Sequence, residues 1–237
     1  MSTSVEELLQ RNSTRLWRAR EPGGAQAARA PTGLPTGHVA LDRCLPGAGW
    51  PRQGLIEILS DQRGIGELKL LLPALAALCR DEGAAAVYPP PHSSDARCQA
   101  GSALLPQDRG SGGWVAWVSP PYRPYAPALA AWGIDVTRVL VVQGAGTTEW
   151  AMDQALRSEA CSAVLGWANP RDPQALRRLQ LAAESSRSLA VLYRPLQAGL
   201  TPSPAVLRLA LLGGSAGLQV RIVKSRGGRP ATVNLGH

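Results

Sequence analysis

The feature that most constrains the fold is an alternation of apolar, strand-like runs with helix-like segments from residue 54 onward. The strand-like runs read "GLIEIL", "WVAWVS", "RVLVVQ" and "SAVLGWA". Apolar runs separated by helices are typical of a parallel sheet whose two faces are both covered. We therefore expect an α/β protein with a mostly parallel sheet flanked by helices.

The intervening segments carry helical signals. We expect helices at 67–81, near 124–132, at about 147–160 and after Asp172. Pro73 lies inside the first of these and predicts either a kink or a later start. Asp172 is suited to be an N-cap because proline follows it at the first helical position.

The C-terminal part of the chain departs from this alternation. In "AVLRLALLGGSAGLQVRIVKS", Leu207, Leu209 and Leu211 share one face of a strand. Val220 and Ile222 lie on a second strand after two glycines. This pattern predicts an antiparallel hairpin that ends the sheet.

The chain divides into segments of different composition. We expect an N-terminal amphipathic helix at 1–20, a flexible linker at 21–37, a core at 38–225 with a surface loop insertion at 84–113, and a basic C-terminal tail at 226–237. The N-terminal helix has two interpretations: it docks on another protein, or it packs against its own domain.

Charge and cysteine content narrow the function classes. The 237 residues carry a formal net charge of +8, which favours polyanionic partners, although many basic proteins bind none specifically. The four cysteines are widely spaced, so neither a zinc site nor a disulfide framework is expected. We expect no signal peptide, because the first residues carry acids and lack a continuous apolar run, and no apolar run elsewhere is long enough to predict a membrane span. We therefore expect a cytoplasmic protein with no membrane partner.

The segment "EILSDQRGIGELKLLLPALAAL" has the frame of a phosphate-binding loop without its chemistry. Gly66, Glu67 and Leu68 stand where such a loop places Gly-Lys-Ser or Gly-Lys-Thr. A carboxylate at this helix start would repel phosphate. The alternative is that Lys69 or Arg63 replaces the missing lysine, but neither would supply the metal ligand or the base.

Several stretches resemble a known group of proteins. "LPTGHVALDRCLPGAGWPRQGLIEIL", "AAWGIDVTRVLVVQ" and "GLQVRIVKSRGGRP" follow the core of RecA recombinases. "GIGELKLLLPAL", "WVAWVSPPYRPYAPALAAWGID", "QALRSEACSAVLGW" and "LRRLQLAAE" are similar to the ImuA family, whose members look like RecA without its ATPase. The cell-division inhibitor SulA shares the same degenerate RecA-like core and is the competing resemblance.

The resemblance implies a RecA-like core with a degenerate nucleotide site. Ser119 and Pro121 stand where the ATPases keep an acidic residue and a water-activating glutamate. Trp167 and Ala168 stand where the magnesium-binding aspartate is expected. We therefore expect a non-enzymatic protein with no catalytic, cofactor-binding or metal-binding residues.

For function, the ImuA resemblance implies an accessory protein of SOS-induced translesion DNA synthesis, a mutagenic form of DNA repair. The implied partners are RecA, ImuB and, indirectly, an error-prone DnaE-type polymerase. The residues expected to dock on a RecA-type core are Val5, Leu8, Leu9, Leu16 and Trp17. The alternatives are a SulA-like inhibitor that binds the division protein FtsZ and an ATP-dependent recombinase-like enzyme.

Two further groups are candidate contact residues. Lys224, Arg226 and Arg229 form a basic tail for ImuB or for weak binding of single-stranded DNA, or else a solubilising end. Tyr122, Arg123 and Tyr125, in "PPYRPYAP", form a secondary partner surface.

Overall fold

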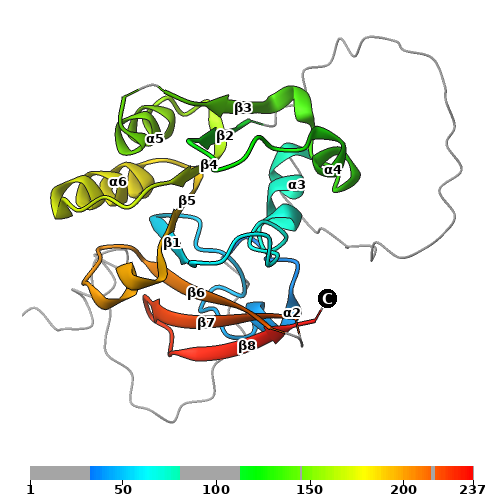
Figure 1. Cartoon of the computed structure of the whole chain (residues 1–237), viewed down its shortest axis with the longest axis vertical. Helices are drawn as coiled ribbons and strands as arrows, with labels where there is room; N and C mark the ends of the chain where they lie inside the picture. Colours follow the sequence, from blue (N-terminus) through cyan, green and yellow to red (C-terminus); the bar gives the residue numbers. More distant parts are fainter. Residues whose placement is uncertain (1–32, 81–112, 145, 215–216, 237) are drawn as a thin grey trace, which may run out of the picture. The chain divides into compact units, whose positions relative to one another are not determined.

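The computed structural model describes residues 33–80, 113–144, 146–214 and 217–236. Their strands form one mixed eight-stranded sheet in the order β3-β2-β4-β5-β1-β6-β7-β8 (Figure 1). The first six strands in this order run parallel: β3 (Val139–Val142), β2 (Trp114–Val118), β4 (Cys161–Trp167), β5 (Leu189–Arg194), β1 (Leu55–Leu59) and β6 (Leu207–Gly214). The last two, β7 (Gly217–Ser225) and β8 (Ala231–Leu235), are antiparallel additions.

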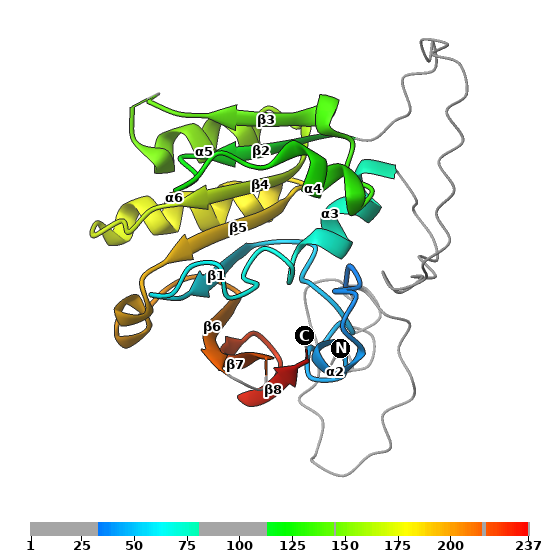
Figure 2. The same ribbon diagram turned by 45° about the vertical axis from the view of Figure 1, so that its right-hand side comes forward.

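Helices cover both faces of the parallel part of the sheet (Figure 2). One face packs against α5 (Thr148–Arg157) and α6 (Pro173–Ser185), whose apolar residues share a core cluster with Leu55 and Val118. The opposite face packs against α3 (Leu72–Arg80) and α4 (Ala126–Ala131). The remaining helical elements are α2 (Val39–Asp42) and two 3-10 helices, η1 (Val136–Arg138) and η2 (Leu196–Leu200).

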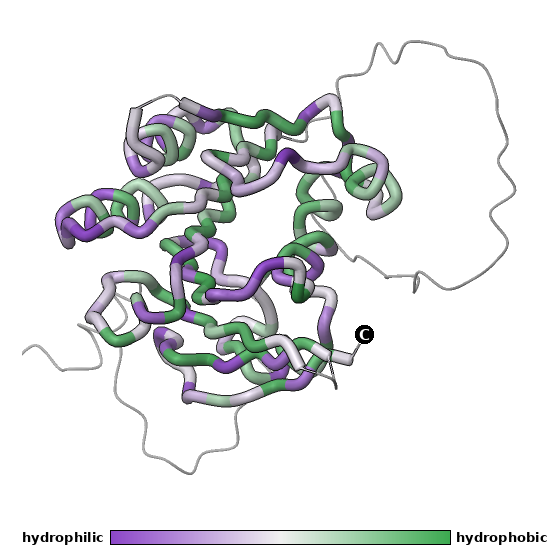
Figure 3. The backbone as a smooth tube through the Cα atoms, in the orientation of Figure 1, coloured by the Kyte–Doolittle hydropathy of each residue, from purple (hydrophilic) through white to green (hydrophobic). Residues whose placement is uncertain are grey.

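The strands at the centre of the sheet, such as β1 and β5, are apolar because both of their faces are buried. All five residues of β1 are buried, and the parallel strands appear as hydrophobic segments of the tube in Figure 3. In β1, Ile56 and Ile58 face the α3 side, whereas Leu55 faces the α5 and α6 side. A strand enclosed in this way loses the apolar–polar alternation of a half-exposed strand.

Local sequence determines where the helices begin. The Asp172 side chain accepts a hydrogen bond from the Gln174 N–H at 2.8 Å, as an N-cap does, so the predicted cap of α6 is confirmed. Pro73 is the second residue of α3, where a missing N–H is tolerated. Of the two outcomes predicted for Pro73, the later start is therefore correct.

The strand β1 lies in the middle of the sheet, between two strands that are distant in sequence. Ile58 pairs with Tyr193 on β5 and with Leu209 on β6. On the other side of β6, Leu209 pairs with Ile222 of β7 across an antiparallel ladder. The α/β class, the mostly parallel sheet and the C-terminal hairpin are thus confirmed.

The segment predicted to be a C-terminal tail contains a strand. Ala231–Leu235, within the segment interpreted as a tail, form β8 and pair with β7. The expected helix at 1–20, most of the linker at 21–37 and nearly all of the loop at 84–113 lie outside the described residues. Among the helices that the structure describes, none has both the length and the apolar character needed to cross a membrane.

Candidate protein-binding site

The loops that follow β1, β2 and β5 leave the sheet at the same edge, because these strands are parallel. In α/β sheets this carboxyl edge is the usual place for a binding site. The segments that follow these strands contain Arg63, Tyr122, Arg123, Tyr125 and Leu200, and we refer to these five residues together as the carboxyl-edge surface.

The loop after β1 connects the other segments of this edge. Asp61 Oδ1 accepts a hydrogen bond from the Leu196 N–H at 2.8 Å, which joins the loop to η2. Gln62 Oε1 accepts one from the Gly213 N–H at 2.8 Å, at the end of β6. The Arg63 guanidinium lies 5.6 Å from the centroid of the Tyr122 ring, within the range of a cation–π contact. The segment that has the frame of a phosphate-binding loop therefore contacts η2, the end of β6 and the loop after β2.

Several large side chains on this surface are exposed. Leu200 is 89% exposed, Tyr125 72% and Tyr122 67%, and both Arg63 and Arg123 are exposed. Aromatic and arginine side chains are the residue types that most often dominate the energy of protein–protein contacts. This combination suits a protein partner.

A buried ionic cluster lies beneath η2. The Glu57 side chain, on β1, is fully buried. Its Oε1 accepts hydrogen bonds from Arg194 Nη1 at 3.0 Å and from Ser203 Oγ at 2.6 Å, and its Oε2 accepts one from Arg208 Nε at 2.7 Å. A charged group this deep in a sheet is stable only when it is paired in this way.

The two arginines of this cluster also bind backbone carbonyls. Arg208 donates to the Ala198 carbonyl at 2.7 Å and to the Thr201 carbonyl at 2.9 Å, on either side of Leu200. Arg194 donates to the Pro170 carbonyl at 3.2 Å. The cluster therefore ties the loop that carries Leu200 to the centre of the sheet. No local sequence pattern connects these residues, although the single charge in "LIEIL" is a signal of a buried carboxylate that needs partners.

An aromatic stack supports the same edge from the α3 side. The ring of Trp167 lies 5.5 Å from that of Trp117 and 4.8 Å from that of Tyr193, and both pairs are stacked. The Tyr193 hydroxyl donates to the Glu67 carbonyl at 3.2 Å. Burial raises the pKa of Tyr193 well above its ordinary value, and the negative charge of Glu67 acts in the same direction. Tyr193 therefore remains a neutral donor.

Glu67 does not occupy the position predicted for it. The helix α3 begins at Leu72, so the Glu67 carboxylate does not lie at the start of a helix. Instead its Oε1 accepts a hydrogen bond from the Gly64 N–H at 3.0 Å. The carboxylate thus binds a backbone donor of its own loop.

The basic residues assigned to the C-terminal tail are attached to the sheet. Lys224 belongs to β7, and its Nζ donates to the Ser203 carbonyl at 2.8 Å. Arg226 pairs with Glu184 at 3.2 Å, and Arg229 is exposed in the turn before β8. The pKa of Lys224 is lowered, first by burial and then by the charges of nearby arginines. Contact of these residues with DNA or with another protein stays a prediction.

The residues predicted to dock on a RecA-type core, namely Val5, Leu8, Leu9, Leu16 and Trp17, lie outside the described residues. Within the described part of the chain, no group of three or more His, Cys, Asp or Glu side chains is arranged to hold a metal ion. The carboxyl-edge surface is therefore the candidate site that the observed geometry supports.

Comparisons with known proteins show which curated proteins this chain is similar to. No protein-family model matches the chain. It is 34% identical over 105 residues to "Cell division inhibitor SulA" of Edwardsiella piscicida. This match covers 44% of this chain and 62% of that protein.

The chain is similar to SulA. A second SulA, from Photorhabdus laumondii subsp. laumondii, is 33% identical over 114 residues, which cover 46% of this chain and 64% of that protein. The chain thus spans less than two thirds of the length of each of these curated relatives. The solved structure of SulA from Pseudomonas aeruginosa has 20% sequence identity and a TM-score of 0.39, and the match covers 59% of this chain and 97% of that one.

These matches correct the functional prediction. The main prediction, an accessory protein of translesion synthesis and mutagenic DNA repair, is wrong, because the curated relatives are named as inhibitors of cell division. RecA, ImuB and the DnaE-type polymerase are wrong as partners for the same reason. These matches support a relationship between this chain and SulA, and they give no support to the narrower assignment to the ImuA family. The sequence motifs did not distinguish ImuA from SulA, because both resemble the core of RecA.

Proposed function

We propose that the protein is a SulA-like inhibitor of cell division that binds the tubulin-like division protein FtsZ. The observation that carries this proposal is the 34% identity over 105 residues to a SulA. FtsZ is the partner that the SulA resemblance implies.

The carboxyl-edge surface is the part of the chain that we assign to this contact. Leu200 and Tyr125 supply exposed area, and the Arg63–Tyr122 pair supplies a positive charge beside an aromatic ring. The hydrogen bonds from Arg208 hold the loop around Leu200, so less conformational freedom is lost when a partner binds.

The protein acts by binding rather than by catalysis in this proposal, and its RecA-like core has a degenerate nucleotide loop. The Glu67 carboxylate supports this view, because it accepts the Gly64 N–H in the loop where ATP phosphates would need backbone donors. Magnesium-dependent ATP hydrolysis by the purified chain would contradict it.

Overproduction in a rod-shaped bacterium tests the inhibitory function. We expect the cells to grow into filaments without division, and to do so in a strain that lacks the other proteins of the DNA-damage response. Purified chain should also reduce FtsZ polymerisation in a sedimentation assay. Normal division at high intracellular levels of folded protein would overturn the proposal.

A matched pair of variants tests the surface. Leu200→Ser and Leu181→Ser remove the same exposed side chain from two places, since Leu181 is 56% exposed on α6. We expect Leu200→Ser to weaken FtsZ binding by about thirtyfold, because burial of an exposed leucine side chain contributes about 2 kcal/mol. Leu181→Ser should leave it unchanged. Equal effects of the two variants would remove Leu200 from the contact.

A further inference from the structure

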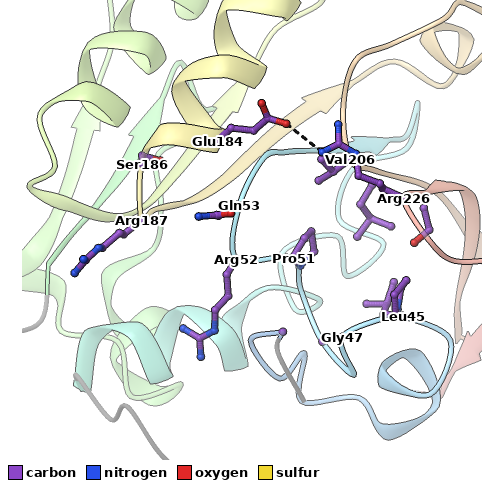
Figure 4. A pocket seen from close by; sticks show the side chains of 15 residues that line it. Leu45, Gly47, Pro51, Arg52, Gln53, Glu184, Ser186, Arg187, Val206 and Arg226 are labelled. Carbon is purple, nitrogen blue, oxygen red and sulfur yellow. Dashed lines mark hydrogen bonds and ion pairs between the residues drawn. The ribbon is translucent and has the colours of Figure 1, made fainter. Parts of the chain in front are cut away.

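A cavity of about 770 Å³ opens at the other end of the sheet, where β1 begins. Its walls are the loop at 45–49, the residues at 51–53 before β1, the end of α6 at 184–187, and the adjoining ends of β6 and β7 (Figure 4). The volume lies in the range of sites that hold a small ligand or a short peptide segment. None of the residues assigned to the carboxyl-edge surface lines this cavity.

The cavity carries a positive charge that the described residues do not neutralise. Arg52, Arg187 and Arg226 line it together with a single acid, Glu184. Glu184 pairs with Arg226 at 3.2 Å, the contact drawn as a dashed line in Figure 4. Arg52 and Arg187 are exposed and make no hydrogen bond or ion pair with any described residue. In Figure 4 their side chains extend outward in different directions, away from Leu45 and Val206. Two guanidinium groups are therefore available to an anionic ligand.

Apolar side chains form the inner part of the cavity. Leu45, Val206 and Leu207 line it and are almost fully buried. Pro46 and Pro51 add rigid apolar walls. Among the described residues that line it, none is aromatic. The site thus offers an apolar floor with cationic groups at its rim.

The wall at 33–50 is held in one conformation by close backbone contacts. The N–H of Leu34 donates to the Trp50 carbonyl at 2.9 Å, and the N–H of Trp50 donates to the Leu34 carbonyl at 2.6 Å. The N–H of Gly33 donates to the Gly47 carbonyl at 2.8 Å. A Cβ on Gly49 would collide with the Leu34 carbonyl, so the two segments approach as closely as glycine allows. The cavity is therefore preformed in this wall.

We propose that this cavity binds an acidic peptide segment, with an apolar side chain on the floor of Leu45, Val206 and Leu207 and carboxylates on Arg52 and Arg187. The planar guanidinium group matches a carboxylate through two parallel hydrogen bonds. The site and its ligand class are independent of the FtsZ assignment, which uses the opposite edge of the sheet.

Charge and composition favour a peptide over single-stranded nucleic acid. Proteins that bind single strands combine a basic groove with aromatic side chains on which bases stack, and the described lining contains no such side chain. Glu184 in the cavity repels the carboxylates of a peptide as well as phosphates, but an extended peptide can place a backbone N–H beside Glu184, a donor that a phosphate backbone lacks.

Fluorescence anisotropy on the full chain tests the proposal. The probe is a fluorescein-labelled peptide of sequence Asp-Glu-Leu-Glu-Ile-Asp, with three comparison probes: the peptide with Gln and Asn in place of its acids, the peptide with Ser in place of Leu and Ile, and labelled oligothymidine. We expect saturable binding of the acidic peptide, weaker binding of the first two comparison probes, and the weakest binding of oligothymidine.

Paired variants locate the binding. The double variant Arg52→Gln, Arg187→Gln should lower the affinity for the acidic peptide by at least about tenfold, because two charged contacts are lost. Arg171→Gln with Arg177→Gln removes the same charge from exposed positions outside the cavity and should change the affinity less than about twofold.

Three results would overturn the proposal: no saturable binding of the acidic peptide, an equal loss in both double variants, or binding of oligothymidine that is tighter than that of the peptide and is weakened by the Arg52→Gln and Arg187→Gln variant. Retention of cell filamentation by the Arg52→Gln and Arg187→Gln variant would leave the FtsZ assignment intact. Either proposal can therefore be refuted without affecting the other.

Discussion

The Glu57 cluster allows a stability prediction with a defined magnitude. In Glu57→Gln, one carboxylate oxygen becomes an NH₂ group, which then faces the donor of either Arg194 or Arg208 instead of accepting from it. The substitution also leaves two buried guanidinium groups without a negative charge. Removal of one partner from a buried ion pair costs about 3–5 kcal/mol. We therefore expect the free energy of unfolding to fall by that amount.

Urea denaturation followed by tryptophan fluorescence measures this loss. With a slope of about 2 kcal/mol per molar urea, the midpoint should fall by about 1.5–2.5 M. Arg226→Ala is the control, because it breaks the Arg226–Glu184 pair, in which both side chains are accessible to solvent. Such exposed pairs contribute about 0–1 kcal/mol. A Glu57→Gln loss as small as that of the control would refute the reasoning.

Three further predictions concern single sites. Gly166→Ala should destabilise the chain by about 1–3 kcal/mol in the same denaturation assay, because the added methyl would collide with Met152, 2.9 Å from its Cγ. Asp172→Ala should lower the free energy of unfolding by about 1 kcal/mol, since it removes the acceptor for the Gln174 N–H at the start of α6. Asp172→Asn should retain most of this stabilisation, because an asparagine side chain also caps a helix. Burial lowers the pKa of His38 in the folded chain, so as the pH falls His38 is protonated in the unfolded chain before it is protonated in the folded chain. The free energy of unfolding should therefore decrease as the pH drops below about 6.5. The variant His38→Asn should lose less stability between neutral and mildly acidic pH, and an identical pH profile would exclude His38 as the cause.

The sequence predicted the strands better than the helix starts. An apolar run such as "WVAWV" permits few alternatives to a buried strand, and β2 occupies those five residues. The segment from Glu67 to Leu71 has helical spacing of leucines, yet α3 begins only at Leu72. Pro73 explains the difference, because proline is best accommodated in the first turn of a helix.

The candidate site was harder to predict because it depends on contacts between distant residues. The composition of "PPYRPYAP" suggested a surface, and Tyr122 and Tyr125 are indeed exposed. Glu57, Arg194 and Arg208 meet only when β1 lies between β5 and β6, so no local pattern connects them. The sequence does not predict the strand β8, because "ATVNL" is short and half-exposed and its pairing depends on β7.

The central position of β1 has a consequence for how the protein is made. The ribosome synthesises this strand well before its two neighbours in the sheet, which follow within residues 189–214. Until then the nascent chain carries an unpaired hydrophobic strand with a lone carboxylate, a state prone to aggregation and attractive to chaperones. A transcript truncated before residue 189 would therefore yield a product without its central pairing, which cellular proteases should clear.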